Sequence, residues 1–317
     1  MKFFSKLLNA MSFVLVLGAQ AHAQVTTIGQ PTKFPIEIKA RGSYRLIGNL
    51  RVLSPDKTAL EITAIGPVTI DLNGFSILGP VTCSGSPATC APSGSGAGIS
   101  GSAQSIVSVF NGTVMGMGGV GISLGTTSRV RDVSAIGNGG GGIATGANSV
   151  VSESSASGNG GDGIAIGANS VVSGCGASNN DGNGIYAEAP GVTIIASTSG
   201  ANRLIGLEAE TVTGSSADSN GDKGIEAPTV ASSTADSNTT LGILAITATG
   251  STMEFNQGDG FGGFLLVDSS SVANGGYGVA GFTDFAFDLF STNTGGSLKA
   301  AGNQLGTSDC NGTVPCP

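Results

Sequence analysis

The chain has 317 residues, a formal net charge of −8, one histidine and no tryptophan. This acidic balance argues against nucleic acid and anionic membrane surfaces as partners, because both are negatively charged. Gly, Ser, Ala, Asn and Thr are abundant and only 11% of the residues are charged, which is typical either of disorder or of a repeat fold with many tight turns.

Residues 1–23 are predicted to be a secretory signal. A short basic start is followed by a mostly apolar run over residues 7–17 and by Ala21-His22-Ala23, which places small residues where signal peptidase cuts. A membrane anchor is the less favoured alternative, because a spanning helix needs about 20 apolar residues. We expect cleavage near Ala23, no membrane insertion, and a mature protein in the periplasm or outside the cell.

Loss of this leader changes the available chemistry. Two of the 13 basic residues and none of the 21 acidic ones lie in it, so the mature net charge is −10. His22, the only histidine, is lost as well. The mature chain therefore has no histidine that could act in a catalytic triad, ligate a metal or serve as an imidazole general base.

Residues 24–67 are predicted to form an N-terminal cap and a first coil. Short alternating runs at 34–38 and 59–65 suit such a cap, which protects the exposed edge of a repeat fold. Two further apolar runs, 68–74 and 105–112, both end in Asn-Gly. The segment 79–97 between them is rich in Gly and Pro and is predicted to be a loop that leaves the stack outward.

An internal repeat dominates the second half of the sequence. Asparagines recur at Asn138, Asn159, Asn180, Asn202, Asn220, Asn238, Asn256 and Asn274, in steps of 21, 21, 22, 18, 18, 18 and 18 residues. Each is followed four places later by glycine and then by an apolar residue. A disordered chain does not keep such a register, so the repeat indicates a folded solenoid.

The columns within the repeat predict short strands. Eight places before each Asn the residue is apolar and mostly β-branched, and after each Gly apolar residues alternate with outward ones, as in strands. A unit of 18–22 residues holds three short strands and three turns, and it buries a core only by stacking at about 4.8 Å per coil. We therefore predict an all-β fold, a parallel β-helix over residues 68–290. The Asn column is expected to occupy the left-handed turn position while its amides bond between coils.

The C-terminal end departs from the repeat. A cluster of large apolar residues is predicted to plug the last coil, with a partner-binding patch as the less favoured alternative. Its members are Phe282, Phe285, Phe287, Leu289 and Phe290. Residues 291–317 are predicted to be a C-terminal tail.

The five cysteines suit an exported protein. Cys83 with Cys90, and Cys310 with Cys316, are natural local disulfide pairs in an oxidising compartment. Metal binding is less favoured, because each place offers two cysteines and no histidine. Cys175 lies in a column of serines and is predicted to be a buried free thiol.

The runs Gly42–Leu50 and Val68–Phe75 and the Asn-x-x-x-Gly-Ile units resemble right-handed parallel β-helix proteins of the pectate-lyase-like superfamily. Within it, the chain is similar to secreted bacterial β-helix-repeat-containing proteins. The resemblance covers roughly residues 34–290 and implies a right-handed solenoid. Members include polysaccharide lyases, hydrolases, epimerases and non-enzymatic surface proteins, so it implies no single activity.

One group of acidic residues is the candidate site. Outward positions two and four places after the anchoring glycines bring together Glu188, Glu208, Glu210 and Glu226 on neighbouring coils, with Arg203, Lys223 and Tyr186 nearby. Clustered carboxylates suit calcium or a glycan. The resemblance also implies that uronate-cleaving enzymes use acidic ligands with a basic residue on this face.

A plain solvated acidic surface is the alternative, and it is favoured on general grounds. A second acidic column, Asp218, Asp236 and Glu254, is assigned to turn chemistry.

Two classes of function remain open. The first is an extracellular binding scaffold that contacts glycan or cell-surface material and needs no cofactor. The second is a polysaccharide lyase with calcium on the acidic face. The lack of Trp and His disfavours the enzyme, because sugar subsites often use aromatic platforms. The oligomeric state is not indicated by the sequence.

Overall fold

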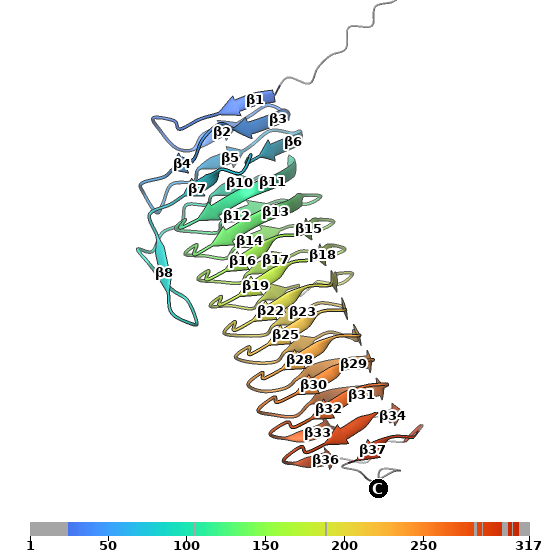
Figure 1. The fold of residues 1–317 in the computed structure, drawn as a ribbon. Coiled ribbons are helices and arrows are strands. Elements are labelled where there is room, and N and C mark those ends of the chain that lie inside the picture. Colours follow the sequence, from blue (N-terminus) through green and yellow to red (C-terminus); the bar gives the residue numbers. More distant parts are fainter. Residues whose placement is uncertain are drawn as a thin grey trace, which may run out of the picture.

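The computed structural model describes residues 25–310 except 104, 188, 282–283, 287, 300–303 and 306. In this part of the chain, 35 strands join into one continuous sheet and two form a separate pair. The sheet winds into a parallel β-helix of about 13 turns, and Figure 1 shows its coils stacked from β1 at one end to β36 and β37 at the other. The predicted signal, residues 1–23, lies outside the described residues.

Each coil contributes one short strand to each of three parallel sheets. Sheet I contains β2 (Ile36–Ile38), β5 (Leu60–Ile62), β10 (Ile99–Gly101), β12 (Ile122–Leu124), β14 (Ile143–Thr145), β17 (Ile164–Ile166), β20 (Ile185–Tyr186), β23 (Leu207–Glu208), β26 (Ile225–Glu226), the first parts of β29 (Ile243–Thr249) and β31 (Phe261–Val267), β33 (Tyr277–Ala280) and β36 (Gly296–Leu298). Sheet II contains β1 (Val25–Ile28), β3 (Gly42–Leu46), β6 (Gly66–Asp71), the first parts of β11 (Ser105–Met115) and β13 (Arg129–Ile136), β15 (Val150–Ser152), β18 (Val171–Ser173), β21 (Thr193–Ile195), β24 (Thr211–Thr213), β27 (Thr229–Ala231), the second parts of β29 and β31, and β34 (Asp284–Ala286). Sheet III contains β4 (Leu50–Arg51), β7 (Ser76–Leu78), the second parts of β11 and β13, β16 (Ser155–Ser157), β19 (Gly176–Ser178), β22 (Thr198–Gly200), β25 (Ser216–Asp218), β28 (Thr234–Asp236), β30 (Thr252–Glu254), β32 (Ser270–Val272), β35 (Leu289–Ser291) and β37 (Asp309–Cys310).

The repeat columns of the sequence become vertical rows in the interior. Ile185, Leu207 and Ile225 are paired in register and are fully buried. Small residues such as Ala217 and Ala235 fill the inner side of sheet III, where the narrow interior leaves little room. The predicted three-stranded coil is therefore confirmed. Among the described residues no helix is long and apolar enough to cross a membrane.

The buried asparagines form one continuous hydrogen-bonded ladder. In the middle of it, Asn180 Nδ2 donates to Asn202 Oδ1 at 2.9 Å and to Ala156 O at 3.1 Å. The backbone N–H of Asn180 donates to the same Asn202 oxygen at 3.0 Å. Each amide thus satisfies backbone groups that the bend removes from the sheets. The ladder extends one member beyond the predicted column, to Asn293.

The glycine four places after each Asn is explained by the same ladder. A Cβ atom on Gly163 would lie 2.7 Å from Asn180 Nδ2 and 2.6 Å from the carbonyl oxygen of Gly184. Both distances are too short for a side chain, so the close approach of backbone to amide requires glycine. Asn and Gly are therefore coupled across coils.

The expectation that the Asn column itself is left-handed was wrong. The residue just before each Asn has the positive φ instead, for example 58° at Gly137, 55° at Ala201 and 56° at Ala273. This preceding residue turns the chain, so the Asn side chain can point inward from an ordinary backbone conformation.

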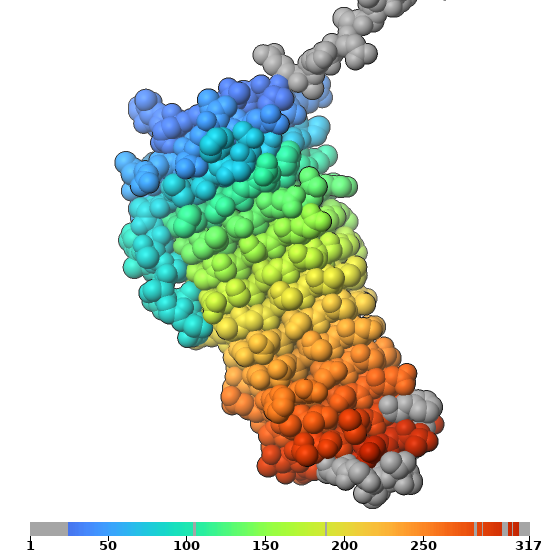
Figure 2. Space-filling view, viewed as in Figure 1, coloured from blue at the N-terminus to red at the C-terminus, as the bar shows by residue number. Residues whose placement is uncertain are grey.

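The predicted loop at 79–97 contains a disulfide-bonded hairpin of β8 (Thr82–Ser84) and β9 (Thr89–Ala91), joined by Cys83–Cys90 as expected. The hairpin leaves the stack, because its two strands pair only with each other. Figure 2 shows it folded along the flank of later coils, where Ser86 Oγ donates to Asn179 Oδ1 at 3.2 Å. Gly160 helps the hairpin to approach closely, because a Cβ at this position would lie 3.3 Å from Cys90 Sγ.

Replacing Cys83 and Cys90 by serine is expected to lower the stability of this hairpin against local unfolding by about 2–3 kcal/mol. This is the chain-entropy contribution of a disulfide that closes so short a loop. Hydrogen exchange of residues 81–92 should become faster while the stack keeps its protection. Ser86→Ala, which removes only the contact at the tip, is the control and should have a smaller effect. Unchanged exchange in the double variant would contradict the stabilising role.

Both ends differ from the predicted boundaries. Residues 24–67, predicted as a cap and first coil, contribute β1 to β5, which are in register with the coil that follows. The stack also continues past residue 290, because β36 and β37 pair with earlier strands. The tail predicted at 291–317 therefore begins too early.

The aromatic cluster near the C-terminal end belongs to a coil. Phe285 and Phe290 are buried and meet edge to face with centroids 5.6 Å apart. Leu289 points outward and is 42% exposed, so the predicted plug is only partly correct. Phe282 and Phe287 lie outside the described residues.

The two other described cysteines, Cys175 and Cys310, lie inside the stack. Cys175 is a buried free thiol, as predicted. Burial raises its pKa, because the thiolate would lose its hydration. Cys310 is also buried, whereas Cys316, its predicted partner, lies outside the described residues.

All of the variation in coil length between residues 138 and 274 falls in one turn, from sheet I to sheet II. Residues 185–193 and 207–211 span the same part of two successive coils, so the second is four residues shorter. The turns of the longer coils therefore protrude beyond those of the shorter coils. This change produces a ledge in the middle of the stack.

Candidate functional site

The ledge overhangs a hollow of about 510 Å³ on the outside of sheet I. Ala187, Ala189 and Pro190 of the longer turn line one side. Glu208, Glu210, Glu226, Ala209 and Pro228 from the next two coils complete the lining. We call this hollow the acidic pocket.

The acidic residues lie where the repeat places them. Tyr186 is paired in register with Glu208, and Glu208 with Glu226. Because successive coils are about 4.8 Å apart, the two glutamates are vertical neighbours on one strand face. The predicted stacking of Glu208 and Glu226 is confirmed, and Glu188 lies outside the described residues.

Lys223 supplies the nearest positive charge. Its Nζ lies 3.0 Å from Glu226 Oε2 and 3.8 Å from Asp222 Oδ2. Burial acts to lower the Lys223 pKa, but the hydrogen bond to Glu226 and the charges of the surrounding carboxylates outweigh it, and the pKa is raised above its usual value. Lys223 is therefore held as a cation beside Glu226.

Arg203 does not join this group. Its guanidinium pairs with Asp181 at 3.4 Å, in the turn of the preceding coil. Glu210 has a structural contact of its own, because its carboxylate accepts a hydrogen bond from the backbone N–H of Gly191. That bond ties the protruding turn to the coil below and shapes the rim of the acidic pocket.

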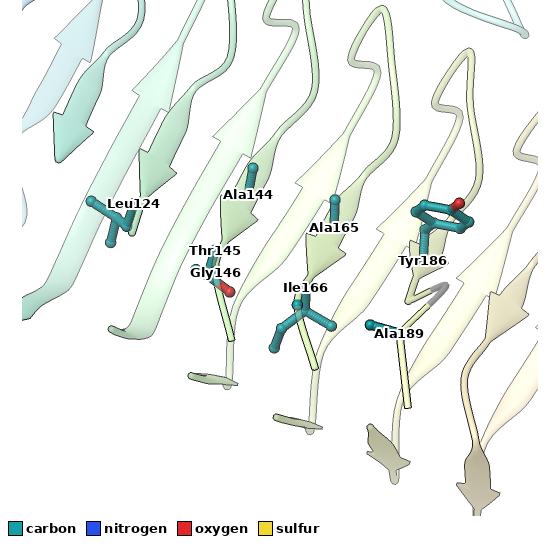
Figure 3. A pocket seen from close by; sticks show the side chains of 9 residues that line it. Leu124, Ala144, Thr145, Gly146, Ala165, Ile166, Tyr186 and Ala189 are labelled. Atoms are coloured by element: carbon teal, nitrogen blue, oxygen red, sulfur yellow. The ribbon is translucent and has the colours of Figure 1, made fainter. Parts of the chain in front are cut away.

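A shallow apolar depression of about 630 Å³ adjoins the acidic pocket at Ala189. Figure 3 shows Ala144, Ala165 and Tyr186 in one row. Leu124, Thr145 and Ile166 form a second row beside them in the same view. Tyr186 thus stands between an apolar surface and the carboxylates.

On the other side of the acidic pocket lie two exposed apolar side chains, of which sequence reasoning missed Phe264. Ile246 is 56% exposed and Phe264 is 69% exposed. The column Glu210, Pro228, Ile246 and Phe264 advances by 18 residues at each step, so extending it by one coil would have found Phe264. From Tyr186 the same face descends four coils to Gly262, a length of about 19 Å.

Among the described residues, no three or more Asp, Glu, Cys or His side chains form a group that could hold a metal ion. The second acidic column is in register, as Asp218, Asp236 and Glu254 end successive strands of sheet III. Ser219 and Ser237 donate to the carboxylates just before them, at 3.1 and 3.3 Å. These local bonds agree with the turn chemistry predicted for that column.

Comparison with known proteins supports the architecture. The sequence matches the family model for a right handed beta helix region over residues 96–281. No curated protein sequence matches the chain.

Several solved structures share the fold. A mutant of the periplasmic alginate epimerase AlgG is 15% identical, with a TM-score of 0.52, over 90% of this chain and 77% of that chain. The catalytic domain of a GH87 α-1,3-glucanase mutant, solved with tetrasaccharides, is 12% identical with a TM-score of 0.54, over 90% and 62%. The tailspike gp49 of Acinetobacter baumannii bacteriophage Fri1, a capsular polysaccharide depolymerase, is 12% identical with a TM-score of 0.50, over 92% and 64%. At such identities the likeness extends to the fold only.

Proposed function

This chain belongs to the right-handed β-helix family, and from that membership and the outer face of sheet I we propose that it is an exported protein that binds glycans. The observation that carries the proposal is the acidic pocket, placed between Tyr186 and the exposed Phe264 on one continuous face. Three solved structures that share the fold are those of an alginate epimerase, an α-1,3-glucanase and a capsular polysaccharide depolymerase.

The face combines two features of sugar-binding surfaces. Carboxylates and a lysine offer charge-assisted hydrogen bonds to hydroxyl groups, and aromatic rings offer flat apolar area with specific geometry. Tyr186 and Phe264 stand about 19 Å apart along the stack, so an extended chain laid parallel to the axis would reach both. Export is supported by the Cys83–Cys90 disulfide, which persists in oxidising compartments.

Charge favours a neutral or amino-sugar glycan. Glu208, Glu210 and Glu226 line the pocket, and Lys223 beside them brings one positive charge against these three carboxylates. A uronate polymer would be repelled unless a cation intervened. Calcium on this face remains a prediction, with Glu188 as a further ligand.

The lyase alternative is less well supported. A catalytic lysine that removes a proton works best with its pKa lowered toward the working pH. Burial lowers the pKa of Lys223, but the bond to Glu226 outweighs it and the net shift is upward. A raised pKa is expected of a lysine that forms an ion pair with Glu226 and positions it. It is not what a general base requires.

Calorimetric titration of the mature protein tests the proposal, with chitosan, neutral cello-oligosaccharides and oligogalacturonate as probes. We expect one of the first two to bind, and Glu208→Gln with Glu226→Gln to weaken it at least about tenfold, since bonds to charged groups contribute about 1.5–3 kcal/mol. Glu61→Gln, an outward residue of the same sheet far from the pocket, is the matched control and should bind normally.

Absence of binding to all three probes would contradict the proposal. Preferential binding of oligogalacturonate with calcium, together with unsaturated product seen by ultraviolet absorbance, would favour the lyase instead.

A further inference from the structure

A second ladder, made of serines, runs through the turn between sheets II and III. The backbone N–H of Ser233 donates to Ser251 Oγ at 3.3 Å, and that of Ser251 to Ser269 Oγ at 3.1 Å. Each hydroxyl also donates to a carbonyl two residues back, as Ser269 does to Val267 O at 2.9 Å. One oxygen per coil is therefore sufficient for this ladder.

In the next coil the ladder position is held by an aspartate. Asp288 Oδ1 accepts the N–H of Ser269 at 2.8 Å, and the N–H of Asp288 donates to Ser308 Oγ at 3.1 Å. These two bonds continue the coil-to-coil hydrogen bonds of the ladder. The second carboxylate oxygen, Oδ2, is buried without a hydrogen-bond partner, in a residue that is only 2% exposed.

A second unpartnered oxygen belongs to another residue that lines the same hollow as Asp288. Asp309, in β37, has a buried Oδ1 that also lacks a partner. Asp288 and Asp309 line one hollow of about 380 Å³, together with Asp268 and the hydroxyl-bearing Thr252 and Ser308. No lysine or arginine is among the described residues that line it.

Buried carboxylate oxygens are stable when they are paired or when they coordinate a cation. We propose that this hollow binds a hard cation of the calcium type, held by Asp288 Oδ2 and Asp309 Oδ1. Neutral oxygens of the lining and water would complete the coordination, since calcium takes six to eight oxygen ligands. So few charged ligands place the affinity near that of extracellular modules, about 10⁻⁴–10⁻³ M.

The site is separate from the acidic pocket, which lies on sheet I several coils away. Its role would be to hold the last coils of the stack in place, because β35 and β37 meet there. Loss of the cation should therefore affect C-terminal stability and leave glycan binding unchanged.

Thermal unfolding of the mature protein, measured in EDTA and in 10 mM calcium chloride, tests the proposal together with calorimetric calcium titration. We expect calcium to raise the Tm by about 2–4 °C and to bind with one site. Asp288→Asn and Asp309→Asn should remove both signals. Asp236→Asn, which changes an acidic residue of sheet III that does not line the hollow, is the matched control and should keep both.

If a variant is destabilised, its Tm no longer reports calcium binding alone. Calorimetric titration of the folded variant with calcium still measures binding directly. No calcium-dependent Tm shift and no binding heat in the unaltered protein would overturn the proposal. A calcium response lost equally in Asp236→Asn would overturn it as well, because the ion would then be bound non-specifically.

Discussion

Replacing Asn238 by alanine is expected to lower the free energy of unfolding by about 3–5 kcal/mol, because stranded buried polar groups each cost about 1–3 kcal/mol. Asn238 Oδ1 accepts both the backbone N–H and the side-chain amide of Asn220 at 3.0 Å. Its Nδ2 donates to Ala217 O at 3.1 Å and to Asn256 Oδ1 at 3.0 Å. Alanine removes all four bonds, and the partner atoms stay inside the stack.

Urea unfolding followed by circular dichroism measures this loss. Thr234→Ala truncates an exposed side chain of the same coil and should change stability by less than about 0.5 kcal/mol. Equal destabilisation by the two variants would show that the ladder is not a principal stabilising element. Because each coil contacts only its neighbours, hydrogen exchange should locate the loss of protection around residues 217–256.

In calcium-free buffer with EDTA, the C-terminal coils are expected to lose stability as the pH rises from about 4 to 8. Burial raises the pKa of Asp288 from its ordinary value of 3.8 to about 7, and Asp268 and Asp309, which face the same hollow, are also acidic. The folded state therefore holds the proton more tightly than the unfolded state. Its stabilising contribution is complete below the unfolded pKa and is lost as pH rises through the folded pKa.

A shift of three pKa units corresponds to about 4 kcal/mol. Asp288→Ser, which restores the serine of the ladder, should remove the pH dependence and be the more stable protein at pH 8. Hydrogen exchange of β35 and β37 at pH 5 and pH 8 is the measurement. An equally steep pH dependence in Asp288→Ser would exclude Asp288 as its source.

The sequence was sufficient for the architecture because the repeat is physically coupled. Asn180 needs Gly163 beside it and Asn202 needs Gly184, so the Asn-Gly spacing reports which residues are stacked. The register of Tyr186, Glu208 and Glu226 followed directly, and with it the stacking of the two glutamates on one face. The disulfide of Cys83 and Cys90 was equally local.

Features that depend on changes in spacing were not predicted. Asp288 follows Ser269 by 19 residues and Ser308 follows Asp288 by 20, so the serine ladder no longer aligned with an 18-residue period. The flank contact of the hairpin joins Ser86 to Asn179, 93 residues away, and no pattern within the repeat indicates it. The pairing of Arg203 with Asp181 depends on side-chain direction within a turn.

Restricting length differences to one corner of the coil has an evolutionary consequence. Both ladders run through the other two corners, where an inserted residue would interrupt every hydrogen bond above and below it. The corner from sheet I to sheet II carries only a short serine ladder, from Ser128 through Ser149 to Ser170, and four residues are lost there between later successive coils. Mutation can therefore remodel the rim of the acidic pocket, and with it the choice of ligand, while inheritance of the scaffold remains intact.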